Sequence, residues 1–257
     1  MLEFSAFEIS AILVILFAGG LLQGSIAFAG GVFGVPLLLL VGLSLPQAIA
    51  VNIVSNLPQN GLAAYRLRHD IHYRDTLGPV ILRLISLPIG LWALWQAHSI
   101  DPHQIKRVVG IILIIILVAQ WLVQVEPRKK LHPAWTLVAF LSSGFLAGFC
   151  SMGGAFIALW VVAHDWSTNR SRGFMFFMFL ISLGPQALLL LGVFRNEVSA
   201  ACGLALAALP VSMTGTWLGL YLGGRLPRVA LRRVVHAVLV LIALQAILAP
   251  FFSFNAE

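Results

Sequence analysis

The sequence predicts an all-α polytopic membrane protein made of two related halves. Hydrophobic residues make up 60% of the chain and charged residues only 10%, whereas a soluble domain carries roughly 25% charged residues. Apolar stretches of roughly 20 residues, the length that a helix needs to cross a bilayer, recur along the whole chain. The third observation is that landmarks of the first half return in the second half in the same order.

These landmarks divide the chain into two repeats within one integral membrane domain. They are Gly20 and Gly24 with Gly144 and Gly148, Gly30-Gly31 with Gly153-Gly154, Pro58-Gln59 with Pro185-Gln186, and Lys106-Arg107-Val108-Val109 with Arg232-Arg233-Val234-Val235. We therefore expect membrane repeat 1 over residues 1–126 and membrane repeat 2 over residues 127–257. Duplicated membrane proteins most often place a substrate pathway between their repeats.

Each repeat contains five apolar segments. In the first repeat they are Ile9–Ala29, Val32–Leu43, Pro46–Tyr65, Leu77–Ala97 and Val108–Val125. In the second repeat they are Pro133–Phe149, Ala155–Ala163, Phe174–Phe194, Ser199–Gly223 and Val234–Phe252. The second segment of each repeat follows a Gly-Gly pair and, at about 1.5 Å of rise per residue, is too short to cross the bilayer unaided. We expect a short broken helix in each repeat, packed inside the protein.

The positive charges favour an inverted repeat. If all ten segments cross and the N-terminus lies outside, twelve cationic residues fall on one side of the membrane and three on the other. The first group is Arg66, Arg68, Arg74, Arg128, Lys129, Lys130, Arg170, Arg172, Arg225, Arg228, Arg232 and Arg233. If the short segments do not cross, this bias almost disappears. Because cytoplasmic loops are enriched in Lys and Arg, the sequence favours five plus five segments with both termini outside, and the formal charge of +7 then gives no reason to expect a nucleic-acid partner.

The two Gly-Gly pairs are candidate ligand-adjacent breaks. Glycine lets backbone or ligand approach closely, and the N-terminus of the following short helix would present N–H groups suited to an anion. This interpretation covers Gly30, Gly31, Gly153 and Gly154. Close helix packing is the alternative for glycines in general, and it is the favoured interpretation for the Gly-x-x-x-Gly pairs that precede them.

Polar residues inside apolar sequence form the second candidate group. They are Asn52, Ser55, Asn56, Gln59 and Asn60 in one segment, Ser182 and Gln186 in the matching segment, and Ser151 before the second Gly-Gly. Polar side chains at membrane depth usually face the interior of a helix bundle. As a set, we expect them to line the two sides of a central site and to offer uncharged donors to an oxyanion. Hydrogen bonding between helices is the alternative for any one of them.

Arg83 is the one cation predicted well inside a span. It could extend its side chain back to the interface, or it could contact an anionic substrate.

Nothing in the sequence predicts an enzyme or a cofactor. There is no HExxH, GxSxG or Walker motif and no pair of carboxylates inside a span. Cys150 and Cys202 lie in apolar segments without metal-ligand spacing, so no metal site is expected.

The chain resembles the TauE/SafE family of sulfite exporters and related anion permeases. The resemblance rests on Gly24-Ser-Ile-Ala-Phe-Ala-Gly30-Gly31-Val-Phe-Gly34-Val-Pro36, followed by Ala50-Val-Asn52-Ile-Val-Ser55-Asn56. It implies movement of sulfite, an organosulfonate or another small anion across the bacterial cell inner membrane. The second half has fewer glycines and no Asn in its matching segment, so a fully symmetric site is not implied.

The leading hypothesis is a secondary transporter that moves a small anion by alternating access, in contact with the lipid bilayer and with a coupling proton or Na+ left open. Oligomeric state is also left open. One alternative is a non-transporting membrane scaffold or assembly subunit, which predicts no enclosed cavity. A less favoured alternative is an intramembrane hydrolase, because neither Ser25 nor Ser151 has a His at matching depth.

Overall fold

The computed structural model describes residues 5–98, 100–122, 131–223 and 240. Within these ranges the chain folds into helices and has no β-strand. They are α1 (Ala6–Ile26), α2 (Ala29–Leu40), α3 (Leu45–Arg66), the 3₁₀ helix η1 (Arg68–Asp70), α4 (Tyr73–Ala97), α5 (Pro102–Leu122), α6 (Pro133–Cys150), α7 (Gly154–Val162), α8 (Thr168–Ala207) and α9 (Leu209–Gly223). The predicted all-α class is confirmed. The last predicted span, Val234–Phe252, lies outside the described residues apart from Val240.

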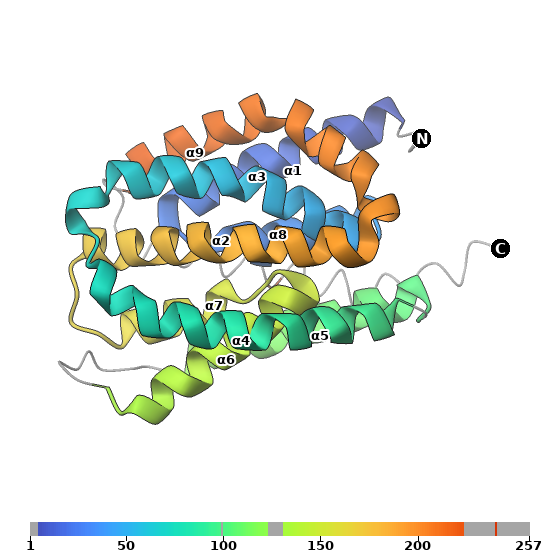
Figure 1. Cartoon of the computed structure of the whole chain (residues 1–257). Coiled ribbons are helices and arrows are strands. Elements are labelled where there is room, and N and C mark those ends of the chain that lie inside the picture. The colour runs from blue at the N-terminus through green and yellow to red at the C-terminus, as the bar shows by residue number, and fades with distance from the viewer. Residues whose placement is uncertain (1–4, 99, 123–130, 224–239, 241–257) are drawn as a thin grey trace.

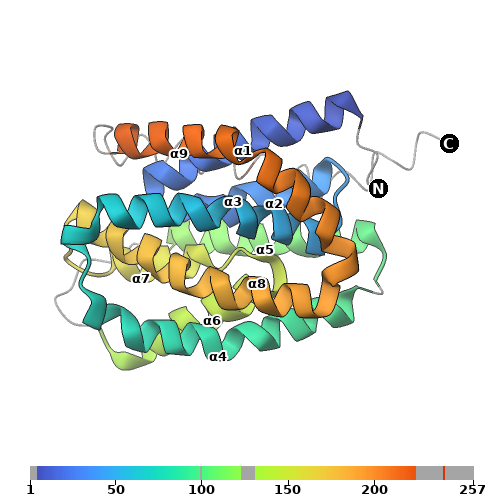
Figure 2. The same cartoon turned by 45° about the horizontal axis from the view of Figure 1, so that its top comes forward.

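The long helices are arranged as three packed pairs. α1 packs along α9, α3 packs along α8, and α4 packs along α6. Figures 1 and 2 place the α3–α8 pair between the other two pairs. The first helix of each predicted repeat therefore packs on the fourth segment of the other, and the third segments meet at the centre. The inversion of the repeats and their boundaries stay predictions.

The predicted short helix is present in both halves, as α2 with 12 residues and α7 with 9 residues. The chain does not break at the glycines themselves. Left-handed backbone falls on Ala27, with φ of 72°, and on Ser151, with φ of 58°. The Gly-Gly pairs instead lie at the start of the short helices, because that is where another backbone approaches. A Cβ on Gly31 would lie 1.8 Å from the carbonyl oxygen of Ser151.

The Gly-x-x-x-Gly pairs are packing sites, as favoured from the sequence. Cβ atoms on Gly20 and Gly24 would lie within 2.4 Å of backbone oxygens of α9, and Cβ atoms on Gly144 and Gly148 within 2.2 Å of backbone oxygens of α4. Glycine at these four positions lets the α1–α9 and α4–α6 pairs approach backbone to backbone.

The eighth and ninth predicted segments are correct in place but differ in their boundaries. α8 continues past the predicted end and bends at Phe194, whose φ of −117° and ψ of 21° are not helical. A second interruption at Ala208 separates α8 from α9. Pro210 accounts for this interruption, because proline lacks an N–H for the preceding turn and restricts the residue before it.

One face of α4 is exposed and apolar. Leu77, Ile81, Ile85, Ile89 and Trp92 are 55–61% exposed, a continuous apolar stripe that a soluble protein would bury. Within the described part of the chain, α1, α4, α6 and α8 are long and apolar enough to cross a membrane. The chain is a multi-pass membrane protein whose apolar stripe suits contact with lipid tails.

Several arginines lie at one end of the bundle, where α3 ends and where α4 and α8 begin: Arg66, Arg68, Arg74, Arg170 and Arg172. α3 ends at Arg66, η1 follows, and α8 begins beside η1. The side chain of Arg170 contacts Asp75 at the start of α4, with 2.7 Å between Nη2 and Oδ2. Which side of the membrane this end faces stays a prediction.

Candidate functional site

Polar side chains of α3 and α8 face each other at the centre of the bundle. They form what we call the polar seam, which consists of Asn52, Ser55, Asn56, Gln59 and Asn60 of α3, Ser182 and Gln186 of α8, and Ser151 at the C-terminal end of α6. All are buried except Ser151, which is half-buried. The polar residues predicted from two distant segments are therefore brought together. Their spacing of three or four residues places them on one face of each helix.

Hydrogen bonds connect the two helices through Ser151. Asn52 Nδ2 donates to Ser151 Oγ over 2.8 Å. Gln186 Nε2 donates to the same oxygen over 3.3 Å and to the Ala147 carbonyl over 2.7 Å. Asn56 Nδ2 donates to Asn52 Oδ1 over 2.6 Å and to the Asn52 carbonyl over 2.8 Å. The amide donors expected for an oxyanion are thus largely engaged within the protein.

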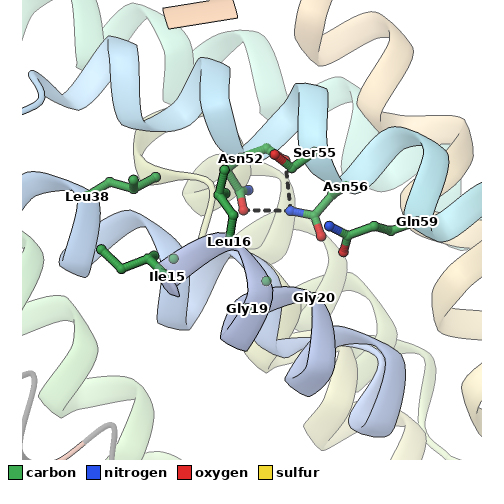
Figure 3. A pocket seen from close by; sticks show the side chains of 11 residues that line it. Ile15, Leu16, Gly19, Gly20, Leu38, Asn52, Ser55, Asn56 and Gln59 are labelled. Atoms are coloured by element: carbon green, nitrogen blue, oxygen red, sulfur yellow. Dashed lines mark hydrogen bonds between the residues drawn. The ribbon is translucent and has the colours of Figure 1, made fainter. Parts of the chain in front are cut away.

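A small cavity opens beside α3, between α1 and α2. Its volume is about 20 Å³, room for about one water molecule. The lining residues are Ile15, Leu16, Gly19, Gly20, Gly30, Gly34, Leu38, Asn52, Ser55, Asn56 and Gln59. Figure 3 shows the Asn56 and Gln59 amides extending from α3 toward Gly19 and Gly20 of α1. All lining residues come from the first half, whereas the polar seam spans both halves.

Gln23 organises the first Gly-Gly region, a role that was not predicted from the sequence. Its Oε1 accepts from the Gly30 N–H over 2.8 Å. Its Nε2 donates to Asn60 Oδ1 over 2.9 Å and to the Ala27 carbonyl over 3.0 Å. The Gly30 N–H predicted to face a ligand is therefore satisfied by a side chain. A polar residue between Gly20 and Gly24 was the available signal.

The other predicted glycines contact backbone of neighbouring segments. Gly31 lies against the Ser151 carbonyl, Gly153 against the Ser143 carbonyl, and Gly154 against the Phe28 carbonyl. Gly30 alone among the four lines the cavity, where it faces the Asn56 side chain. These contacts have the character of close packing. A role for Gly31, Gly153 and Gly154 in ligand binding stays a prediction.

Arg83 of α4 is buried at 4% exposure rather than extended to the interface. Its Nε donates to Ser182 Oγ over 3.1 Å, and its Nη1 donates to the hydroxyl and carbonyl of Ser143. The guanidinium carbon lies 5.4 Å from the centre of the Phe179 ring. No Asp or Glu in the described ranges is buried. The guanidinium is therefore held by neutral groups, and it touches the polar seam through Ser182.

A second buried arginine, Arg172, has a different setting. Its Nη2 donates to the Gly24 carbonyl over 2.6 Å, near the C-terminal end of α1 where a cation is favoured. Arg172 was expected among the cations at one side of the membrane; it lies in the first turns of α8, and its contact indicates a capping role.

The described residues offer no catalytic arrangement at Ser25 or Ser151. Ser25 Oγ is bonded to the carbonyls of Leu21 and Gly219, and Ser151 Oγ accepts from amides. Among the residues that the structure describes, no group of three or more His, Cys, Asp or Glu could hold a metal ion.

Comparison with known proteins identifies the family. No curated protein and no solved structure matches the chain. The sequence does match the family described as Sulfite exporter TauE/SafE over residues 11–246, which is most of the chain and includes the whole polar seam, Gln23 and Arg83. That family consists of membrane transporters rather than enzymes. The chain therefore belongs to the TauE/SafE sulfite exporter family.

Proposed function

We propose that this protein is a secondary transporter that moves a small oxyanion, most simply sulfite or an organosulfonate, across the bacterial cell inner membrane by alternating access. The observation that carries the proposal is the setting of Arg83. Its side chain is 4% exposed and its hydrogen-bond acceptors are neutral.

A buried cation without a counter-ion is costly. An anion that approaches the guanidinium would offset that cost and would gain charge-assisted hydrogen bonds. Arginine has five N–H donors, and the contacts that hold Arg83 in the described residues use only Nε and Nη1. Donors on Nη2 are thus suited to a planar or pyramidal oxyanion at the side of the polar seam.

The two ends of α4 supply candidate closures for alternating access. At its start, Asp75 pairs with Arg170 of α8. Beyond its other end, His98 Nδ1 lies 3.7 Å from Glu197 Oε2, and Glu197 also accepts a hydrogen bond from the Ser44 hydroxyl. Both contacts join separate helices at the surface, so each could open while the other stays closed.

Proteoliposome transport of ³⁵S-labelled sulfite tests the proposal. We expect saturable uptake that competing sulfonates reduce. Arg83→Gln should lower transport at least about tenfold, because a hydrogen bond to a charged ligand contributes roughly 1.5–3 kcal/mol. Arg83→Lys keeps the positive charge but lacks the planar guanidinium group with its paired donors, so it should retain part of the sulfite transport.

Arg68→Gln is the matched control. Arg68 is exposed, and in the described residues its side chain contacts only the Tyr65 carbonyl and ring, so transport should stay at the wild-type level. Sulfite transport by Arg83→Gln at the wild-type rate would show that Arg83 does not contact the substrate. Absence of sulfite and sulfonate transport by folded wild-type protein would favour the scaffold alternative.

A further inference from the structure

We propose that the cavity beside α3 binds one Na+ ion, held by Ser55 Oγ, Asn56 Oδ1 and Gln59 Oε1. The inference rests on the proposed function and names the cation that moves together with the anion. It draws on three observations. They are buried oxygen atoms without hydrogen-bond partners, the size of the cavity, and a short sequence motif that occurs in both halves but contacts an arginine only in the second.

The first observation is that these three atoms are buried and have no hydrogen-bond partner in the described structure. All three residues line the same cavity (Figure 3). The orientation of the Asn56 amide is fixed, because its Nδ2 must donate to two oxygens of Asn52. Its Oδ1 is therefore an acceptor. An unpaired buried polar group is destabilising, so three such oxygens at one cavity indicate that a cation or a hydrogen-bond donor occupies it.

The second observation is the size and charge of the cavity. A volume of about 20 Å³ has room for about one water-sized body, which suits a monatomic ion better than an oxyanion of four heavy atoms. Acceptor oxygens also repel an anion. Mg²⁺ and Ca²⁺ are normally held with carboxylates, and no Asp or Glu within the described residues is buried. A small monovalent cation fits both limits.

The third observation is the recurrence of Ser-x-x-Pro-Gln. Residues 55–59 carry it in α3, and residues 182–186 carry it in α8. In α8, Ser182 Oγ accepts a hydrogen bond from the Arg83 guanidinium, a fixed cation. In α3, Ser55 Oγ has no such partner among the described residues. A bound Na+ would supply beside Ser55 the charge that Arg83 supplies beside Ser182.

The proline in this motif also frees a backbone oxygen of α3 from its helical hydrogen bond. Pro58 has no N–H, so the carbonyl of Val54 cannot receive the usual helical hydrogen bond from residue 58. Carbonyls released in this way inside broken helices are a common source of Na+ ligands in transporters.

Charge balance connects this cation with the anion. Arg83 supplies one positive charge, and a fully deprotonated sulfite carries two negative charges. One Na+ supplies the second positive charge. No buried carboxylate or His is present within the described residues to carry a proton instead. The hydrogen-bonded chain through Asn52, Ser151 and Gln186 lies between the two halves of the seam and joins their helices.

Binding of ²²Na+ to purified full-length protein in detergent tests the site directly. We expect saturable binding that Li+ reduces and choline does not. Gln59→Leu removes one ligand and should weaken Na+ binding at least about tenfold. Gln59→Glu keeps the shape and adds a negative charge, so it should tighten Na+ binding. Opposite effects from one position separate ion ligation from simple misfolding.

Thr76→Val is the matched control. Thr76 is buried in α4 and its hydroxyl bonds to the His72 carbonyl, away from the cavity, so ²²Na+ binding should be unchanged.

A second experiment tests whether the ion is needed for transport. Sulfite uptake by the wild-type protein is measured with Na+ replaced by choline, and we expect a loss of at least about tenfold.

The outcomes separate this inference from the proposed function. Sulfite transport that needs no Na+, with no saturable ²²Na+ binding, would overturn the cation site and leave the transporter proposal intact. The cavity would then hold water. Saturable ²²Na+ binding without transport of any sulfite or sulfonate would support the site and contradict the proposed substrate. Equal Na+ binding by Gln59→Leu and wild type would mean that Gln59 is not a ligand and would overturn the proposed site.

Discussion

Asn52 donates from Nδ2 to Ser151 Oγ over 2.8 Å, although 99 residues separate the two in the sequence. Asn52 lies in α3, and Ser151 ends α6 with left-handed backbone at φ of 58°. The carbonyl of Ser151 also packs directly on Gly31 at the start of α2. Through its hydroxyl and its carbonyl, Ser151 thus links α6 to both α3 and α2.

This bond should contribute measurably to stability. Ser151→Gly removes the hydroxyl while allowing the left-handed backbone, and Asn52→Ala removes the donor. A double-mutant cycle on thermal unfolding in detergent should give a coupling free energy of about 0.5–1.5 kcal/mol. Additive effects of the two changes would mean that the contact adds nothing to the folded state.

Glycine at position 148 should be required for folding. A Cβ on Gly148 would lie 2.2 Å from the Leu87 carbonyl oxygen, so Gly148→Ala must separate α6 from α4. We expect a clear loss of monodisperse protein in size-exclusion chromatography. Gly203→Ala is the control, because nothing lies within 4 Å of a Cβ there and alanine in a helix is favoured by about 1 kcal/mol. Similar yields from both variants would contradict the close packing of α6 on α4.

Gln23 should stabilise the start of α2 and the end of α3 together. Gln23→Leu leaves the Gly30 N–H and the Asn60 Oδ1 without the partners they have in the native protein. Because an unsatisfied buried group costs about 1–3 kcal/mol, we expect a lower unfolding temperature. Gln23→Glu retains the acceptor for Gly30 but sets a buried carboxylate against the oxygens of Asn60 and Ala27, so it should not recover the loss. A neutral effect of Gln23→Leu would show that water replaces both bonds.

His164 should make stability fall in mild acid. It lies between α7 and α8 with its ring 4.1 Å from that of Trp160 and 4.6 Å from that of Trp166. Burial lowers the pKa of His164 below its ordinary value of 6.5, and its hydrogen bond to the Trp160 carbonyl opposes this only in part. The unfolded chain therefore binds the proton first as pH falls. Stability present above pH 6.5 is lost as pH falls through the lowered pKa.

His164→Phe should remove this contribution to the pH dependence. Unfolding temperatures of wild type and variant are measured across the range in which His titrates. The wild type should lose more stability on acidification than the variant does. Parallel pH profiles would assign the acid sensitivity to other groups.

The helix order and the two short helices could be predicted from the sequence, because apolar length and glycine position depend on local composition. α3, α4 and α6 begin or end within a few residues of the predicted bounds. The residues at which the chain leaves α1 before α2, and α6 before α7, were less predictable. Positive φ falls on Ala27 and Ser151, since the glycines are needed where another backbone approaches.

The sequence by itself determined which residues are polar at membrane depth, and burial of Asn52, Asn56 and Gln186 follows from that. Only the tertiary structure decided which of their atoms remain available. Amide donors are engaged by Asn52, Ser151 and Ala147, while acceptors beside the cavity are left unpaired. The reason is that a hydrogen bond depends on the direction and distance of groups on separate helices, and sequence spacing fixes neighbours only along one helix.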